Sequence, residues 1–359
     1  MALPIPKSAS DPSAPVRVLL IGDHAVTVDA VEAALKAVRD IEIAAKAGNT
    51  PQAVVALKNS GVDVAILDIG MHGPAIERVL GKLKAARPDI PVILIASLTF
   101  RSVKASMAAL LAGAAMFIPI PGKHHKENNP VTFRRALLDT IRGLAGRKVA
   151  ERVVLPHPPI SIRLRVHAPA RPDVIAIGSS TGGPHALFAV LRDLPLEMKA
   201  PILITQHIPA GFTAELAKSL GKAARRPGAE GRDGEKIDPG RIYVAPGGFH
   251  MLVEKKGPAK IIRVTSDPPE NFCRPAVDPM FRSVARAYGA NVLAVILTGM
   301  GRDGTVGGKA IVEAGGTVIA QDEGTSIVWG MPGAAAEAGI CSHILPLDGI
   351  APAIVKLAK

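Results

Sequence analysis

A serine between two glycines is the first residue in this sequence that suggests chemistry. The segment IAIGSSTGGP fits the pattern G-x-S-x-G, with Ser180 between Gly178 and Gly182. That pattern places a serine on a sharp turn between a strand and a helix, with its hydroxyl exposed above the sheet. A phosphate-binding loop is the competing interpretation, but the segment fits neither G-x-G-x-x-G nor G-x-x-x-x-G-K-[ST]. A plain glycine-rich connection is the structural alternative.

A serine nucleophile needs a histidine base and a carboxylate that orients the histidine, because its hydroxyl is unreactive near neutral pH. Two residues have the required placement. His207 directly follows the apolar run PILITQ, and Asp303 lies in a glycine-rich turn after NVLAVILTG. Ser180 also follows an apolar run, so all three are predicted just past the C-terminal ends of parallel strands, where sites form in open α/β sheets. The order Ser, His, Asp differs from that of the common α/β-hydrolases.

Other histidines and acids lack this placement. His250 begins a predicted strand and His343 follows a short helix, so both are predicted to be ordinary surface or core residues. Asp278 stands in RPAVDP before a predicted helix, which favours a capping role. The two cysteines, Cys273 and Cys341, have no metal-ligand spacing and are too few for a disulfide framework, which agrees with a reducing compartment.

The elements that position these residues follow from short apolar runs that alternate with helix-like stretches, a pattern typical of parallel sheets covered on both faces. The first group predicts strands at 16–22, 41–48, 62–70, 91–97 and 115–121. The second group predicts strands at 173–178, 201–206, 241–246, 250–254, 261–265, 291–299, 316–321 and 342–346. The sequence therefore predicts the α/β class, with two doubly wound domains of mainly parallel sheets.

Domain boundaries follow from changes in composition. Residues 1–14 are polar and proline-rich and are predicted to be disordered, residues 15–146 form the first α/β domain, and residues 172–359 form a larger, hydrolytic one. Between them, residues 147–171 form a basic linker interrupted by prolines. A short strand at 160–166 within this linker is an alternative.

Charge and composition exclude several classes of protein. The net charge is +12, but residues 121–171 hold eight more Lys and Arg than Asp and Glu, so most of the excess lies in one connecting segment. Aromatic residues make up only 3%, too few for the stacking platforms of single-strand nucleic-acid binders, and we expect no specific nucleic-acid partner. The N-terminus lacks the apolar core of a signal peptide, and no run approaches the ~18 apolar residues of a membrane span. A cytoplasmic protein is expected.

Six linked segments resemble one family, the protein-glutamate methylesterase/protein-glutamine glutaminase of bacterial chemotaxis. In chain order they are IGSSTGGP, ITQHIPAGFT, RIYVAPGGFHM, RPAVDPMF, VILTGMGRDG and IAQDEGTSIVWGMP. The resemblance covers about residues 173–357 and implies that Ser180 is the nucleophile, His207 the base and Asp303 the orienting acid. It also implies that the backbone N–H groups of Thr181 and Met300 stabilise the oxyanion.

The resemblance further implies a reaction on methyl-accepting chemotaxis receptors. Ser180 would attack the γ-carbonyl of a methylated glutamate, His207 would pass the serine proton to departing methanol, and water would hydrolyse the acyl-enzyme. A glutamine would lose ammonia by the same course. No metal or organic cofactor is expected for this chemistry. The enzyme is expected in the cytoplasm, with recruitment to membrane receptor arrays as a further expectation.

The first domain resembles a response-regulator receiver, a flavodoxin-like fold, but key positions differ. Asp68 matches the phospho-accepting aspartate, and Asp23 matches one of the two acidic residues that hold Mg²⁺, whereas the other position is Gly22. Ala96 stands in place of a hydroxyl residue, and Ile120 in place of the lysine before the final proline. Cation and lysine offset charge on a phosphoryl group. We therefore hypothesise that this receiver does not switch through an aspartyl phosphate; Mg²⁺ binding and a sensor histidine kinase as partner are kept as alternatives.

Two other functions are left open. One is the same esterase chemistry on another methylated protein, in a signalling pathway other than chemotaxis. The other is a regulatory scaffold whose non-phosphorylated receiver docks partners, an interpretation against which the set of Ser180, His207 and Asp303 argues.

Overall fold

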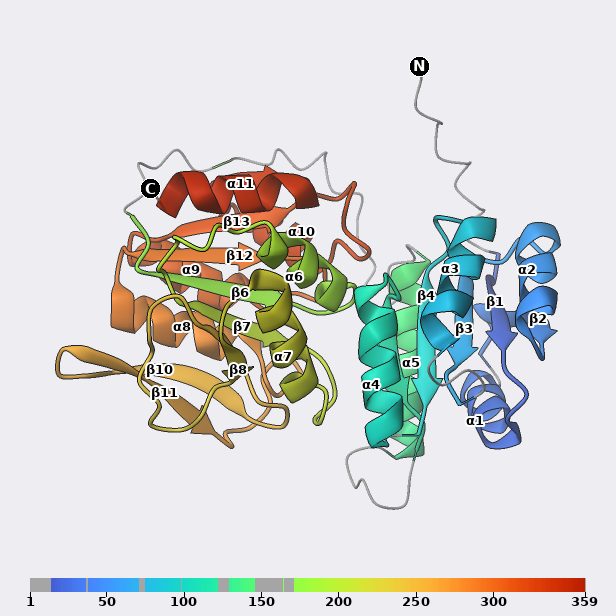
Figure 1. Cartoon of the computed structure of the whole chain (residues 1–359). Helices are drawn as coiled ribbons and strands as arrows, with labels where there is room; N and C mark the ends of the chain where they lie inside the picture. The colour runs from blue at the N-terminus through green and yellow to red at the C-terminus, as the bar shows by residue number, and fades with distance from the viewer. Residues whose placement is uncertain are drawn as a thin grey trace. The chain divides into compact units, whose positions relative to one another are not determined.

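Each of the two predicted α/β regions contains its own sheet in this computed structural model (Figure 1). The chain divides into two compact units, and residues 99–117 of the first region are grouped with the second unit. The structure describes residues 14–36, 38–70, 75–97, 99–121, 129–145, 164 and 171–358. The predicted disordered N-terminus, the predicted linker and the alternative strand at 160–166 lie almost wholly outside these residues, so the predicted domain boundaries stay predictions. None of the helices in the described ranges is long and apolar enough to cross a membrane.

The first sheet has five strands in the order β2-β1-β3-β4-β5, the flavodoxin-like order. Its strands are β1 Val16–Ile21, β2 Ile41–Ala47, β3 Val64–Asp68, β4 Val92–Ala96 and β5 Met116–Pro119. Its helices are α1 Ala25–Leu35, α2 Thr50–Asn59, α3 Ile76–Ala86, α4 Phe100–Leu111 and α5 Pro130–Leu144. Every position of β3 and β4 is buried, as continuous apolar runs require of strands covered on both faces. All five predicted strands are present.

The second sheet has seven strands in the order β14-β13-β12-β6-β7-β9-β8, and every neighbouring pair is parallel. Its strands are β6 Val174–Ser179, β7 Ile202–Gln206, β8 Gly228–Glu230, β9 Ile242–Val244, β12 Val292–Ile296, β13 Thr317–Gln321 and β14 His343–Leu345. The helices are α6 Gly183–Arg192, α7 Thr213–Ala224, α8 Val277–Tyr288, α9 Thr305–Glu313, α10 Met331–Glu337 and α11 Leu347–Ala358. The short edge strand β8 was not predicted, because its sequence GAE offers no apolar run.

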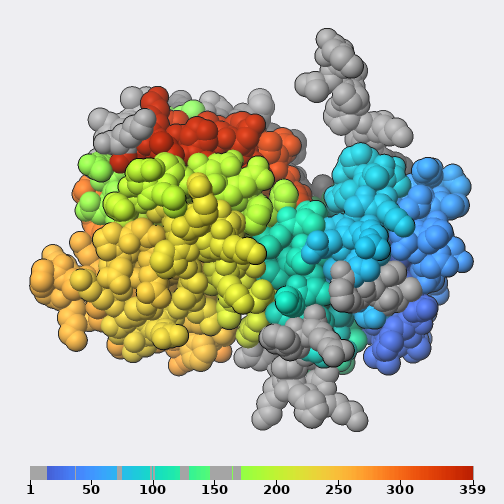
Figure 2. Space-filling view, in the orientation of Figure 1, coloured from blue at the N-terminus to red at the C-terminus, as the bar shows by residue number. Residues whose placement is uncertain are grey.

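A two-stranded antiparallel hairpin interrupts this second α/β pattern, as the sequence indicated. It consists of β10 His250–Lys256 and β11 Ala259–Thr265, and Lys256 pairs with Ala259 next to the turn. In the space-filling view the hairpin lies at the outer edge of its unit (Figure 2). Its base is anchored in the core, where Met251 and Ile262 are buried.

The middle of the second sheet is the part that positions a site. β6 pairs with β12 on one side and with β7 on the other, so the C-terminal ends of these three strands meet at one edge. From β6 the chain continues to β7 on one side, whereas β12 lies on the other side and continues to β13, so the strand order reverses here. Such a topological switch point is the usual place for a ligand site. Helices α6 and α7 pack together, and α8 and α9 pack together, in two layers on opposite faces of the sheet (Figure 1).

Candidate active site

Ser180 is the first residue after β6, at the switch point. It is buried, with 5% of its surface exposed, and its N–H donates to the carbonyl of Thr298 at 3.0 Å. The loop after β12 closes against it: a Cβ atom on Gly299 would lie 2.8 Å from the Cβ of Ser180. Only glycine permits this approach, which brings the Gly299–Met300 segment next to the serine.

His207 follows β7 directly and is fixed by its backbone. Its N–H donates to the carbonyl of Ser179 at 3.0 Å. The buried amide of Gln206 ties the two strand ends together, because its Nε2 donates to the carbonyls of Ser180 at 2.8 Å and of His207 at 2.9 Å. Its Oε1 accepts from the hydroxyl of Ser179 at 2.6 Å. No sequence pattern predicted a role for Gln206.

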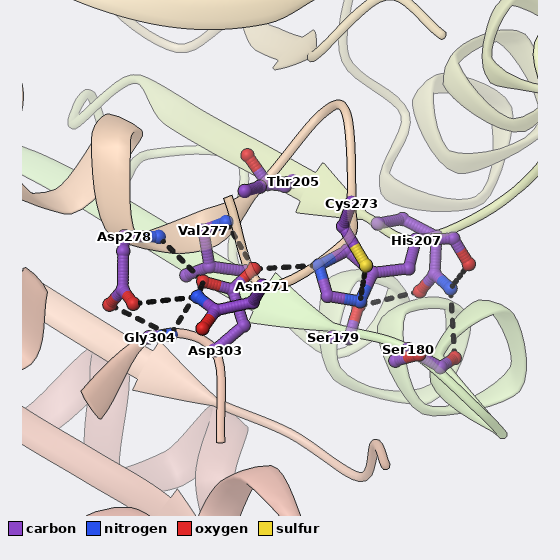
Figure 3. A network of polar contacts seen from close by, with 12 residues as sticks. Ser179, Ser180, Thr205, His207, Asn271, Cys273, Val277, Asp278, Asp303 and Gly304 are labelled. Carbon is purple, nitrogen blue, oxygen red and sulfur yellow. Dashed lines mark hydrogen bonds and ion pairs between the residues drawn. The ribbon is translucent and has the colours of Figure 1, made fainter. Parts of the chain in front are cut away.

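The ring of His207 contacts Asp303, which lies in the loop between β12 and α9. His207 Nε2 is 2.7 Å from Asp303 Oδ2 (Figure 3). The carboxylate of Asp303 is almost fully buried and also accepts N–H groups of Val277 at 2.6 Å, Asp278 at 3.0 Å and Gly304 at 3.0 Å. Burial alone would raise the pKa of Asp303, but these donors and the positive charge of His207 lower it. Asp303 is therefore an ionised acceptor that fixes the orientation of the imidazole.

Two aspartates exchange helix caps in this loop region. The carboxylate of Asp303 accepts the first N–H groups of α8, whereas the carboxylate of Asp278, which lies in α8, accepts the N–H groups of Gly304 at 2.9 Å and of Gly307 at 2.7 Å at the start of α9. Asp278 thus caps a helix as predicted, but the helix is α9. Burial, and then the nearby charge of Asp303, raise the pKa of Asp278.

Asn271 joins these two buried carboxylates. Its Nδ2 donates to Asp278 Oδ2 at 2.9 Å and to Asp303 Oδ1 at 2.8 Å. A neutral amide that donates to both oxygens reduces the repulsion between two acids held side by side. Asn271 could not be predicted from the sequence, because it lies in a connection without periodicity.

Cys273 lies at the other nitrogen of the histidine. Its Sγ is 3.5 Å from His207 Nδ1 (Figure 3). Burial of the ring would lower the pKa of His207, but the electrostatic and hydrogen-bond contacts with Cys273 and Asp303 raise it to about 10. With Nε2 turned to Asp303, Nδ1 is the nitrogen left to take a proton, and among the described residues Ser180 makes no hydrogen bond to it. The structure thus brings His207 and Asp303 together, with Ser180 at the adjacent strand end and Cys273 at the ring nitrogen that the serine needs.

Replacing Cys273 with alanine should move the acid limb of the pH–rate profile to lower pH. A base works only when neutral, so kcat/KM rises with pH as His207 loses its proton. Cys273 and Asp303 are the groups that face the ring and raise the pKa of His207, so removing Cys273 should lower that pKa. Each unit of displacement corresponds to about a tenfold higher rate on the acid side of the limb.

The measurement is kcat/KM for ester hydrolysis across the pH range, with Cys341→Ala as the matched control. Cys341 is buried far along the chain, in the core, and burial raises its thiol pKa to about 12, so it carries no charge at neutral pH. Its removal should leave the limb in place. A limb that stays unchanged in Cys273→Ala would contradict the assignment.

The predicted oxyanion donors are available at the serine. Within residues 171–358, neither the N–H of Thr181 nor that of Met300 donates to a protein acceptor. The loop that carries Met300 is held by hydrogen bonds from Gly299 N–H to Val328 and from Met331 N–H to the Gly299 carbonyl, at 3.0 and 2.8 Å. Fixed amide donors beside a nucleophile are suited to a developing oxyanion.

His250 and His343 have the ordinary roles expected of them. His250 is a buried structural residue whose ring accepts the N–H of Ala276 at 3.2 Å and contacts the carbonyl of Pro268 at 3.1 Å. His343 is exposed at the start of β14. Neither contacts His207 or Ser180.

In the first unit, the residues that match the phosphorylation site of a receiver domain fit Mg²⁺ poorly. Asp68 is buried at the end of β3; its Oδ1 accepts the Gly70 N–H at 2.8 Å and its Oδ2 has no partner in the described residues. That oxygen would be one metal ligand and Asp23 would offer a second, but a Cβ on Gly22 would lie 2.8 Å from the Asp68 Cβ, so a third acid does not fit without a shift. No group of three His, Cys, Asp or Glu suited to a metal occurs among the described residues.

Comparison with known proteins covers both units. Residues 175–354 match the family described as CheB methylesterase, and residues 18–126 match the response regulator receiver domain. A protein-glutamate methylesterase/protein-glutamine glutaminase of Paramagnetospirillum magneticum is 46% identical, over 100% of this chain and 99% of that protein. The chain belongs to the CheB methylesterase family.

Other relatives agree with this assignment. A protein-glutamate methylesterase/protein-glutamine glutaminase of Azospirillum brasilense is 46% identical, over 96% of this chain and 93% of that protein. The crystal structure of the CheB methylesterase catalytic domain of Thermotoga maritima is 39% identical, with a TM-score of 0.51, and covers 52% of this chain and 100% of that one. The predicted resemblance, the two α/β folds and the hydrolase class are confirmed: this CheB methylesterase is a carboxylic ester hydrolase joined to a receiver domain.

Proposed function

We propose that this chain hydrolyses glutamate γ-methyl esters, and deamidates glutamine side chains, on methyl-accepting chemotaxis receptors. Ser180, His207 and Asp303 are the catalytic triad, and the reaction passes through an acyl-enzyme. The relatives named for these two activities span the whole chain, which supports the substrate class. The 2.7 Å contact between His207 Nε2 and Asp303 Oδ2, at the strand end next to Ser180, is the observation that carries the proposal.

The proton path follows from the ring's orientation. Asp303 holds the Nε2–H of His207, so Nδ1 accepts the proton of the Ser180 hydroxyl as its oxygen bonds to the ester carbonyl carbon. The carbon–methoxy bond then breaks, and Nδ1 returns the proton to the leaving oxygen, giving methanol. Water attacks the acyl-enzyme by the same route and restores glutamate and the Ser180 hydroxyl. For this path the Nδ1 atom of the His207 ring must contact the Ser180 hydroxyl and not the Cys273 sulfur.

The charge that builds on the ester oxygen is met by fixed amides. Within residues 171–358, the N–H groups of Thr181 and Met300 donate to no protein acceptor. They serve as the oxyanion donors. Each such donor contributes roughly 3 kcal/mol to the transition state. These residues supply base, nucleophile and oxyanion stabilisation, so the proposed reaction draws on no metal or organic cofactor.

Methanol release tests this function. A methylated receptor is incubated with the full chain and with a shortened chain that begins near residue 172, and methanol is quantified. We expect release by both, because every proposed catalytic group lies after residue 172. Release from a different methylated protein but never from a receptor would favour the non-chemotactic alternative, and no ester hydrolysis by either chain would favour the scaffold.

The receiver, we further propose, is not controlled through an ordinary aspartyl phosphate. The close approach of Gly22 to Asp68 and the buried side chain of Ile120 support this. Gly22 stands where an acidic residue would hold the cation, and Ile120 stands where a lysine would offset charge on the phosphoryl group. A sensor kinase partner, a cytoplasmic location and recruitment to receptor arrays stay predictions.

Incubation with acetyl phosphate and Mg²⁺ should leave the mass of the intact protein unchanged. A receiver with its full acidic set would gain one phosphoryl group at the aspartate under the same conditions and serves as the positive control. An Asp68→Asn variant identifies the site of any mass gain. Ready phosphorylation that disappears in Asp68→Asn would refute the proposal.

A further inference from the structure

One side-chain amide lies between two buried carboxylates that repel each other. Asp278 and Asp303 are each only 2% exposed. The Nδ2 atom of Asn271 donates to Asp278 Oδ2 at 2.9 Å and to Asp303 Oδ1 at 2.8 Å, so the two carboxylates are close neighbours (Figure 3). Burial, and then the charge of Asp303, raise the pKa of Asp278, whereas the hydrogen bond from Asn271 lowers it.

The amide of Asn271 differs from the other donors to this pair. Apart from His207, every other group in the described residues that donates to either carboxylate is a backbone N–H at the start of α8 or α9. Those N–H groups belong to the helices and cannot be removed by a substitution. Asn271 is thus the one neutral side chain in the described residues that holds both acids.

The turn that carries Asn271 offers a purely structural explanation for this residue. The backbone groups of Glu270 and Cys273 bond each other in both directions, at 3.2 and 2.8 Å, and the φ angle of Asn271 is 50°. Asparagine is favoured at such a left-handed position, but glycine is favoured there as well. Glycine therefore satisfies the turn and lacks the amide, so a glycine substitution separates the two roles.

We propose that Asn271 is a positioning residue for the esterase reaction: its amide keeps Asp303 ionised and aimed at His207 although a second carboxylate lies beside it. The inference rests on the proposed function, in which His207 is the base. Two carboxylates that share a site disfavour each other's charged form, and a hydrogen bond donated to a carboxylate favours that form. Without the amide, a proton is retained to higher pH, and Asp303 becomes a poorer partner for the Nε2–H of the ring.

The charged groups around the pair set the sign of this effect. His207 Nε2 lies 2.7 Å from Asp303, and Cys273 contacts the same ring at 3.5 Å. Arg282 of α8 pairs with Glu270 at 2.5 Å, and after this bond the charges of both carboxylates also raise the pKa of Arg282. All of these groups remain when the amide is removed. A lost donor therefore raises the pH at which the site sheds its proton, and activity is lost earlier as the pH falls.

Asn271→Gly should move the acid limb of kcat/KM for methanol release from a methylated receptor about one unit toward higher pH. On the acid side of the limb, kcat/KM should be about tenfold lower than in the unaltered protein, and the loss should shrink as the pH rises. Asn291→Gly is the matched control. The Asn291 amide donates to the carbonyl of Arg171 at 3.1 Å, and this residue precedes β12, at the opposite end of that strand from Asp303. Its limb should stay in place.

A double variant tests the mechanism by removing charge. Asp278→Asn added to Asn271→Gly leaves a single carboxylate and places a new amide beside it. The oxygen of that amide still accepts the N–H groups of Gly304 and Gly307, so α9 keeps its cap. We expect the limb to return to its position in the unaltered protein or to lower pH. A purely structural role predicts the reverse, with the double variant the least active at every pH.

The failure of the inference differs from the failure of the proposed function. Methanol release by the unaltered protein, with the same acid limb in Asn271→Gly, overturns the inference alone. A limb that moves in Asn271→Gly but does not move back when Asp278→Asn is added overturns it too, because the shift would then not come from the neighbouring carboxylate. No methanol release from receptors by the unaltered protein overturns the proposed function itself.

Discussion

Ser180→Ala should reduce methanol release from a methylated receptor by about 10⁴-fold or more, the loss typical of removing a serine nucleophile from a triad. The fold should survive, because the Ser180 hydroxyl makes no hydrogen bond among the described residues and alanine fills nearly the same volume. We therefore expect an unchanged melting temperature together with almost no activity. Receptor binding should persist, because the backbone N–H donors of Thr181 and Met300 remain.

Ser179→Ala is the matched control for this variant, since it removes the adjacent hydroxyl. That hydroxyl donates to Gln206 Oε1 at 2.6 Å, so its loss should cost about 1 kcal/mol of stability and at most about tenfold in rate. Equal losses in the two serine variants, or full activity in Ser180→Ala, would contradict the assignment of the nucleophile. Methanol release and thermal unfolding of both variants decide the matter.

Asp303→Asn should lower kcat by about 10⁴-fold, because an amide reverses the tautomer of the base. The carboxylate keeps the proton of His207 on Nε2. An amide N–H would donate to Nε2, leave the proton on Nδ1 and so remove the acceptor that Ser180 needs. The variant should also be less stable, at about 1–3 kcal/mol for each buried donor left unpaired, since one amide oxygen cannot serve every N–H group that now points at Asp303.

Kinetics and melting of Asp193→Asn provide the comparison for this second variant. Asp193 pairs with Arg192 on the surface after α6, so an amide there should change neither quantity measurably. If Asp303→Asn lowered stability but retained kcat, Asp303 would be a helix cap alone and the triad assignment would be wrong.

The sequence predicted the strands well because these strands are parallel and fully buried. β6, β7 and β12 are continuous apolar runs, and the residues with chemistry follow each run directly, so the shared edge could be inferred without coordinates. The same logic explains why β8 was missed. Its three residues have no apolar run and pair with β9 only at the edge of the sheet.

The contacts that tune the site could not be inferred in this way. Cys273 and Asn271 lie in a connection without periodicity, and only the tight turn between Glu270 and Cys273 brings them to His207 and Asp303. The exchange of caps between Asp278 and Asp303 joins residues 25 positions apart, whereas a capping rule looks only at the helix that follows. The place of Cys273 at the Nδ1 atom was therefore also invisible in the sequence.

The cap exchange between α8 and α9 has a consequence for how such an enzyme is turned on and off. Asp303 is at once the partner of the imidazole and the cap of α8, so it cannot turn away from His207 without leaving the first N–H groups of α8 unpaired. A control signal that moved this carboxylate would therefore lower the stability of the fold. Any control signal must then act on groups that can move with little loss of stability. One is the His207 ring, whose Nδ1 can contact either the Cys273 sulfur or the Ser180 hydroxyl. Another is the path by which a substrate side chain reaches Ser180.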